Sequence, residues 1–209
     1  MPDAHIALIY AHPYAEQSLA NRELLAATDD LSFVARRSLY DLYPDFDIDV
    51  EVEQRVLAAA DLIVLQHPLY WYSMPALLKL WIDDVFALGW AYGDGGTALV
   101  GKSLLWVATT GGDVRAYTPE GPHGHPFDAF IAPVQQTARF CGMHWQEPLI
   151  VHDAHAEREH VVTAGQRYRE RLLGFRQQQS LAIGGSTHKT PDPTLLSPLL
   201  WAPLARTSP

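Results

Sequence analysis

Short segments of strand type alternate along the chain with longer segments of helical periodicity, and this alternation limits the possible folds more than any other feature. The expected strands are short and mostly apolar: residues 5–10, 31–39, 61–66, 103–109 and a part of 143–151. The expected helices combine good helix formers with apolar residues at three- and four-residue spacing: residues 18–28, 50–60, 73–88, 127–141 and 157–175. A strand followed by a helix, five times over, implies parallel strands with right-handed crossovers.

This pattern predicts an α/β fold: a doubly wound, five-stranded parallel sheet of flavodoxin-like order, 2-1-3-4-5, with helices on both faces. The chain has 209 residues and is 48% hydrophobic, which is enough to bury the core of one such domain. In folds of this kind ligands bind outside the carboxyl ends of the strands. We therefore look for a site in the loops that follow the strands.

Residues 178–209 differ from the rest of the chain, because they are rich in Pro, Ser and Thr and show no periodic pattern. We expect residues 1–177 to form the domain and residues 178–209 to form a C-terminal tail. The tail contains the sequence LLSPLLWAPL, which is unusually apolar for a segment free in solvent. It is either a mobile tail or an arm that lies on a neighbour.

The composition argues against several classes of protein. A formal net charge of −9 does not suit a protein that mainly binds nucleic acid, because such binding needs clustered Lys and Arg. The single cysteine, Cys141, cannot form an internal disulfide, so no oxidising compartment is required. No apolar run approaches the ~20 residues of a membrane span, and the N-terminus lacks a signal sequence. We expect a cytoplasmic protein, which could still attach peripherally to the inner face of the cell membrane.

The first loop that follows a predicted strand, residues 11–21, leads into a helix without the glycines of a dinucleotide-binding G-x-G-x-x-G motif. Ser18 and Asn21 stand where this helix begins. Free backbone N–H groups and the positive end of the helix dipole favour a dianionic phosphate there, and the hydroxyl and amide can add donors. His12 could donate a further hydrogen bond. In the plainer interpretation, Ser18 only caps the helix and His12 is a turn residue.

The second loop, HPLYWYSMP at residues 67–75, follows the most clearly buried of the expected strands. Tyr70, Trp71 and Tyr72 cannot all point into one core, because neighbours in an extended segment face opposite ways. Several flat amphipathic rings at the end of a central strand suit a flat aromatic ligand, with backbone amides at its polar edge. The alternative is that these rings fill a dimer interface, and the two uses are compatible.

The third loop, TTGGDVRAYTPEGPHG at residues 109–124, is not a phosphate-binding P-loop. It lacks the G-x-x-x-x-G-K-[ST] pattern, and Asp113 would repel a phosphate. Its adjacent glycines can instead let the backbone lie against a ring system. The imidazole of His123 can give or take a proton at neutral pH, and the phenol of Tyr117 can donate to a developing oxyanion. Both could also be incidental loop residues.

Two other kinds of site are rejected. A metal site at His123 and His125 has no carboxylate or thiol cluster to complete it, so no metal is expected. A low-molecular-weight phosphatase needs the pattern C-x5-R, and Cys141 is followed by GMHWQE, which contains no arginine.

Three stretches together carry a resemblance to a known family. They are YAHPY followed by Ser18, Ala20 and Asn21 in the first loop, QHPLYWYSMPALLKLWIDDVFALGWAYG through the middle, and GKSLLWVATTGG at the fourth strand. In combination they resemble the flavodoxin-like NAD(P)H:quinone oxidoreductases. Within that family the chain looks most similar to the ancillary oxidoreductases of the Kef glutathione-gated potassium-efflux systems, which SLYDLYPDFDIDVEVEQ at residues 38–54 also fits. The resemblance covers about residues 5–176.

The resemblance implies a homodimer that binds FMN or FAD near the subunit interface. The residues that it places around the flavin are His12, Ser18, Leu19, Ala20 and Asn21 in the phosphate region, Leu69, Tyr70, Trp71 and Tyr72 along the isoalloxazine, and Thr109, Thr110, Gly111 and Gly112 at its other edge. The mammalian-type quinone reductases share a frame of T-T-G-G, Tyr, His and Gly. Here that frame is Thr109–Gly112, Tyr117, His123 and Gly124.

The activity that the resemblance implies is a two-electron, ping-pong transfer of hydride from NADH or NADPH, through the bound flavin, to a quinone or a similar acceptor. Tyr117 and His123 would be the catalytic residues and would stabilise negative charge on the reduced flavin or on the quinone oxygen. The alternative belongs to another class of function. It is a regulatory ancillary subunit of a membrane potassium-efflux antiporter, with the flavin as a sensing or structural element.

Overall fold

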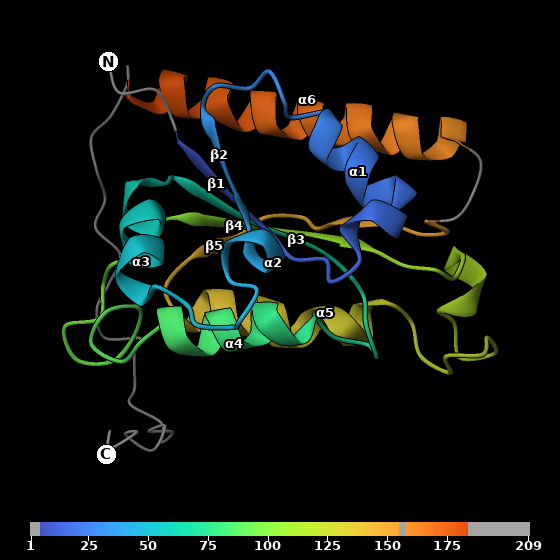
Figure 1. Cartoon of the computed structure of the whole chain (residues 1–209), viewed down its shortest axis with the longest axis horizontal. Coiled ribbons are helices and arrows are strands. Elements are labelled where there is room, and N and C mark those ends of the chain that lie inside the picture. Colours follow the sequence, from blue (N-terminus) through green and yellow to red (C-terminus); the bar gives the residue numbers. More distant parts are fainter. Residues whose placement is uncertain (1–4, 155–157, 184–209) are drawn as a thin grey trace.

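The computed structural model describes residues 5–154 and 158–183 (Figure 1). Its strands form one parallel sheet in the order β2-β1-β3-β4-β5, and β6 also pairs with β4. The strands are β1 Ile6–Tyr10, β2 Val34–Ser38, β3 Leu62–Pro68, β4 Ser103–Thr109, β5 His144–Trp145 and β6 Leu149–Val151. The α/β fold and the strand order predicted from the sequence are confirmed.

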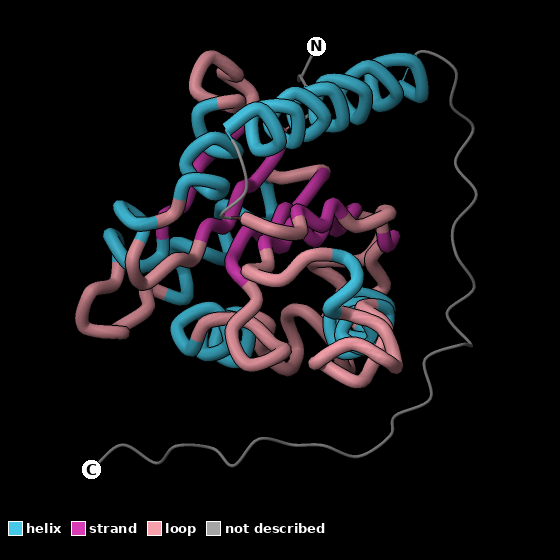
Figure 2. The backbone as a smooth tube through the Cα atoms, turned by 90° about the vertical axis from the view of Figure 1, so that its right-hand side faces the viewer, coloured by secondary structure: helices cyan, strands magenta, loops and turns pink. Residues whose placement is uncertain are grey.

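Helices cover both faces of the sheet, as Figures 1 and 2 show. The helices α1 Leu19–Ala26 and α6 Arg158–Ile183 lie side by side on one face. The helices α3 Val50–Ala59, α4 Ala76–Val85 and α5 Asp128–Phe140 lie on the other face, and the short α2 Leu39–Leu42 follows β2. None of the helices in the described part of the chain is both long and apolar enough to cross a membrane.

The core is divided by the sheet into two clusters, because successive side chains of a strand point to opposite faces. Along β1, Ile6 and Leu8 belong to the cluster beneath α1 and α6. Ala7 and Ile9 belong to the cluster on the side of α3, α4 and α5. Every residue of β1, β3 and β4 is buried, as expected for central strands covered on both faces. Burial of each large aliphatic side chain contributes about 1.5–3 kcal/mol.

The strand predicted within residues 143–151 is divided into β5 and β6. The register shows why: Ser103 pairs with His144, whereas Val107 pairs with Leu149, so one extra residue is inserted on the outer strand. This is a bulge, and a shift of one residue moves the following side chains to the other face. Trp145 accordingly packs against one core cluster and Leu149 against the other.

Other bounds also differ from those predicted. Helix α4 starts at Ala76 and not at residue 73, because a tight turn that pairs Tyr70 with Ser73 comes directly before it. Short 3-10 helices, η1 Ala15–Gln17 and η2 Val114–Ala116, occupy the first and third loops. Helix α6 continues to Ile183, beyond residue 175, at which we expected the helix to end. The remainder of the predicted tail, residues 184–209, lies outside the described residues.

Candidate functional site

The first loop places Ser18 at the start of α1, at the carboxyl end of β1. Ser18 is the N-cap residue, and its Oγ accepts a hydrogen bond of 3.3 Å from the backbone N–H of Asn21. The hydroxyl proton of Ser18 is therefore free for another acceptor. The backbone N–H groups of Leu19 and Ala20 lie in the first turn, where a helix supplies no carbonyl for them. Capping and anion binding are thus compatible at this helix end, because each uses different atoms.

The imidazole of His12 is held in one tautomer beside this helix end. Its Nδ1 accepts a hydrogen bond of 3.0 Å from the backbone N–H of Tyr14. Burial lowers the pKa of His12, so the ring is neutral at pH 7 and carries its proton on Nε2. The ring lies 6.1 Å from that of Tyr70 in an edge-on arrangement. His12 can therefore donate a hydrogen bond from Nε2, as the sequence suggested.

Asn21 links the first loop to the third. Its side chain is fully buried, and Nδ2 donates to Ser18 Oγ at 3.1 Å and to Thr109 Oγ1 at 2.9 Å. Its Oδ1 accepts from Nε2 of Gln66 at 3.3 Å. The amide is thus occupied within the protein. The predicted donation from this amide to a phosphate would require giving up one of these bonds, whereas its bridging position holds Ser18 and Thr109 together.

The second loop reverses direction in a tight turn at the end of β3. Tyr70 and Ser73 pair through two backbone hydrogen bonds of 2.9 Å, so Trp71 and Tyr72 occupy the two central positions. Both central residues have positive φ, 47° and 64°, as in a turn of type I′. A residue with a side chain pays about 1–2 kcal/mol for this backbone conformation, which glycine adopts freely. Both residues are therefore held in a conformation that their side chains disfavour, and strain of this kind is often found at binding sites.

The three consecutive rings do not enter the core. Trp71 is 91% exposed, Tyr72 45% and Tyr70 36%. Leu69, which precedes them, is half-buried and donates its backbone N–H to the carbonyl of Thr109 at 2.8 Å. The second loop therefore lies directly against the start of the third.

In the third loop, Gly112 packs closely against residues further along the same loop. A Cβ at Gly112 would lie 3.1 Å from Cβ of Ala116 and 3.4 Å from Nε2 of His123. The missing side chain thus makes room for the returning loop, and not only for a ring system as the sequence suggested. Asp113 caps η2, and its carboxylate pairs with Arg115 at 3.0 Å, which holds the pKa of that carboxyl below its usual value.

Tyr117 and His123, the predicted catalytic pair, lie together. Their ring centroids are 4.4 Å apart, and Tyr117 is buried. Burial raises the pKa of the Tyr117 phenol, so it keeps its proton at neutral pH and can act as a hydrogen-bond donor. On the other side of His123, Nδ1 lies 3.4 Å from the hydroxyl of Tyr72, whose ring stacks on Phe130 at 5.1 Å. The structure therefore brings the second and third loops together at His123.

His152, which was not predicted from the sequence, lies in the same cluster. It follows β6, and its ring lies 5.3 Å from the ring of Tyr117 and 5.1 Å from that of Phe127. Its Nδ1 is 3.0 Å from Oγ1 of Thr110. The only sign in the sequence that His152 could belong to the site was its position directly after a predicted strand. His152 is not part of a recognisable motif.

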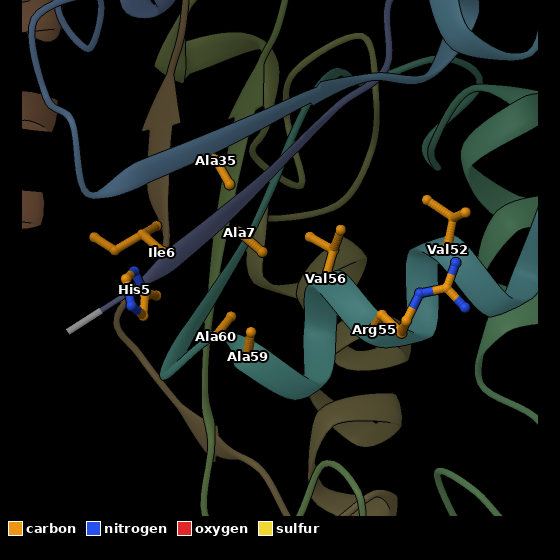
Figure 3. Close-up of a pocket in the computed structure, with 9 residues that line it drawn as sticks. All are labelled: His5, Ile6, Ala7, Ala35, Val52, Arg55, Val56, Ala59 and Ala60. Carbon is orange, nitrogen blue, oxygen red and sulfur yellow. The ribbon is translucent and has the colours of Figure 1, made fainter. Parts of the chain in front are cut away.

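A groove of about 400 Å³ lies elsewhere, between α3 and the amino-terminal halves of β1 and β2 (Figure 3). Its lining consists mainly of small and aliphatic side chains: His5, Ile6, Ala7, Ala35, Val52, Arg55, Val56, Ala59 and Ala60. The three loops discussed above contribute none of these residues. We therefore locate the candidate site by the convergence of loops at the carboxyl ends of the strands. Within the described ranges, no three His, Cys, Asp or Glu side chains gather as a metal site would require.

The comparison with protein families agrees with this architecture. A family model described as the flavodoxin-like fold matches residues 4–172. The chain belongs to this family. Three solved structures illustrate the likeness. A chain described as a thermophilic tryptophan halogenase from Streptomycin violaceusniger is 38% identical, over 80% of this chain and 98% of its own, with a TM-score of 0.77.

General stress protein 14 from Treponema denticola, in complex with FMN, is 30% identical over 83% of this chain and 98% of its own, with a TM-score of 0.76. An NADPH-quinone reductase from P. pentosaceus is 31% identical over 80% of this chain and 96% of its own, with a TM-score of 0.73. The three names differ although the fold is shared. The chemistry of this chain therefore has to be argued from its site.

Proposed function

We propose that this protein is a flavin-dependent oxidoreductase that binds FMN and carries two electrons from NADH or NADPH to a quinone or a similar acceptor. The observation that carries the proposal is the buried Asn21 bridge, which holds the amino end of α1, with its free hydrogen-bond donors, beside the T-T-G-G segment of the third loop. Two of the similar proteins support it: one is named as an NADPH-quinone reductase and another is in complex with FMN.

The side chains at the site fit a flavin mononucleotide. At the helix end, the Ser18 hydroxyl, the first-turn N–H groups and Nε2 of His12 are all donors, which suits a phosphate. In the second loop, the rings of Tyr70, Trp71 and Tyr72 offer flat surfaces for stacking. When bound, FMN would supply the hydride chemistry, accepting two electrons from the nicotinamide and passing them to the acceptor.

The residues of the chain would supply position and charge compensation. The protonated Tyr117 phenol can donate a hydrogen bond to a developing negative charge, and burial makes that bond stronger than it would be in water. The ring of His123 is held between Tyr117 and Tyr72, with Nδ1 within hydrogen-bonding reach of the Tyr72 hydroxyl. Tyr117 and His123 would therefore be the catalytic residues, as expected from the sequence.

We also propose that the protein works as a homodimer. Trp71 is almost fully exposed at the tip of a strained turn. A large ring that stays in solvent contributes little to the stability of a single subunit. A second subunit or a bound ring system would cover it. FAD in place of FMN, and a membrane potassium-efflux antiporter as partner, stay predictions from the sequence, and no contact of the described residues favours either.

Titration of the purified full chain with FMN, followed by stopped-flow reduction with NADH and NADPH, tests the proposal. Wild type should bind FMN and reduce it. Ser18→Ala should weaken FMN binding about tenfold through loss of one hydrogen bond to a charged group. Tyr117→Phe combined with His123→Gln should slow flavin reduction by about tenfold to a hundredfold.

Tyr92→Phe is the matched control, because Tyr92 lies in the loop between α4 and β4, outside the three loops of the site, and its ring lies 5.3 Å from that of Phe140 at the end of α5. It should bind and reduce FMN as wild type does. A protein that takes up neither FMN nor FAD would overturn the proposed function. A double variant that reduces FMN at the wild-type rate would overturn only the role of Tyr117 and His123.

A further inference from the structure

His152 lies where three parts of the site meet. Its ring is half-buried and contacts Tyr117 and Phe127, both from the segment that follows β4. Its backbone carbonyl accepts a hydrogen bond of 2.9 Å from Nε2 of His160, in the first turn of α6. Both the backbone and the ring of His152 are therefore fixed by neighbours.

The hydrogen bonds around Thr110 determine which nitrogen of His152 carries the proton. Oγ1 of Thr110 donates to the carbonyl of Gly112 at 2.8 Å and lies 3.0 Å from Nδ1 of His152. A carbonyl has no proton to give, and a hydroxyl has only one, so the Thr110 proton goes to Gly112. Nδ1 of His152 must then be the donor to Thr110. Burial lowers the pKa of His152, which keeps the ring neutral, with Nε2 unprotonated.

The backbone around this pair is held by three further hydrogen bonds. Thr110 exchanges bonds with Val151 and Ala154, at 2.9 and 2.8 Å, and the N–H of Asp153 donates to the Gly112 carbonyl at 3.0 Å. Asp153 adopts a positive φ of 54°, which turns the chain so that its N–H reaches Gly112. The Gly112 carbonyl thus receives two donors, one from the backbone and one through the His152–Thr110 link.

We propose that His152 is a positioning residue of the site: protonated at Nδ1, it orients the Thr110 hydroxyl, fixes the Gly112 carbonyl, and supports the ring of Tyr117. The expected effect on turnover rests on the proposed flavin function. The positioning itself concerns only the protein without flavin. Hydrogen bonds in a connected series strengthen one another, so removal of the His152 donor should weaken the bond from Thr110 to Gly112 as well.

Two substitutions of His152 distinguish the contribution of its ring from that of its hydrogen bond to Thr110. His152→Phe keeps a ring and removes the donor, and should weaken FMN binding and slow flavin reduction by about three- to tenfold, the range that one neutral hydrogen bond corresponds to. His152→Asn places an amide N–H near the position of Nδ1, and should recover FMN binding to within about twofold of wild type. Recovery by Asn would not be expected if the ring served only as packing.

A double-mutant cycle tests the link directly. Thr110→Val should have the effect of His152→Phe, and the two together should be no worse than either alone, because both remove the same chain of bonds. His144→Phe is the control: His144 is an exposed residue of β5 on the same edge of the sheet and should behave as wild type. Additive effects of the two substitutions would overturn the proposed link.

A second readout does not depend on FMN. In the full chain without FMN, the nitrogen NMR signals of His152 should show a proton on Nδ1, and His152→Phe should speed amide exchange at Asp153 more than His144→Phe does. If wild type binds no flavin but shows both signals, the proposed function fails and the positioning role stands. A proton on Nε2, or unchanged exchange at Asp153, overturns the positioning role.

Discussion

The imidazole of His67 should make the stability of this protein fall as the pH is lowered. His67 is fully buried on β3; its Nε2 accepts a hydrogen bond of 2.6 Å from Nε1 of Trp106, and its Nδ1–H donates to the carbonyl of Pro68 at 2.8 Å. Protonation would place a second N–H against the indole N–H. Burial accordingly lowers the pKa of His67 to about 4.

The sign and the size of this pH dependence follow from the pKa of His67 in the folded and in the unfolded chain. The unfolded chain, with a histidine pKa of about 6.5, binds a proton before the folded chain does, so stability is present above pH 6.5 and is lost towards pH 4. The full difference corresponds to about 3 kcal/mol, of which about 2 kcal/mol falls between pH 7 and pH 5.

Urea unfolding at pH 7, 6 and 5 measures this contribution in wild type and in His67→Gln. The variant should be about 1–2 kcal/mol less stable at pH 7, because it loses the bond to Pro68, and the difference from wild type should shrink by about 2 kcal/mol at pH 5. Carboxylates titrate in both proteins and cancel in the comparison. His144→Gln, at an exposed position, is the control. A difference between wild type and His67→Gln that stays constant from pH 7 to pH 5 would refute the reasoning.

Two further predictions concern a buried carboxylate and the strained turn. Glu53→Gln should lower the free energy of unfolding in urea by about 2 kcal/mol, because this fully buried carboxylate accepts hydrogen bonds from Arg37 and Tyr43. The control is Glu51→Gln, at an exposed position, which should change the free energy of unfolding by less than about 0.5 kcal/mol. Trp71→Gly should raise the melting temperature by about 2–4 °C through relief of the positive φ, whereas Trp71→Ala should not. Both substitutions should weaken FMN binding. Equal melting temperatures for the Gly and Ala variants would show that the turn stores no strain.

The sequence was sufficient for the fold because its strong signals are periodic. Buried strands such as β3 are apolar at almost every position and lie between helices with clear apolar faces, so element type and order follow from local pattern. The bounds were less predictable where a loop competes with an element. Tyr70 and Ser73 form a turn inside a stretch that has the composition of a helix start, and nothing local shows that Trp71 and Tyr72 accept positive φ.

Candidate site residues could be found from the sequence where they belong to a motif, and not where their position depends on the register of a strand. Ser18 lies at a predicted helix start, and Tyr117 and His123 lie in a glycine-rich loop after a predicted strand, so all three could be picked out from the sequence. His152 reaches the cluster only after a bulge has shifted the outer strand by one residue, and period-two alternation cannot reveal such a shift. The bridging role of Asn21 depends on a partner in a distant strand, which a single sequence does not identify.

The bridge from Asn21 to Thr109 also bears on how the molecule opens. These residues are 88 positions apart, yet one buried amide connects the first turn of α1 to the end of β4. Segments linked in this way tend to open as one cooperative unit, because separating them leaves buried polar groups without partners. Fraying at the amino end of α1 would therefore loosen the end of a central strand. An anion that settles on that helix end would slow hydrogen exchange in a part of the sheet that it never touches.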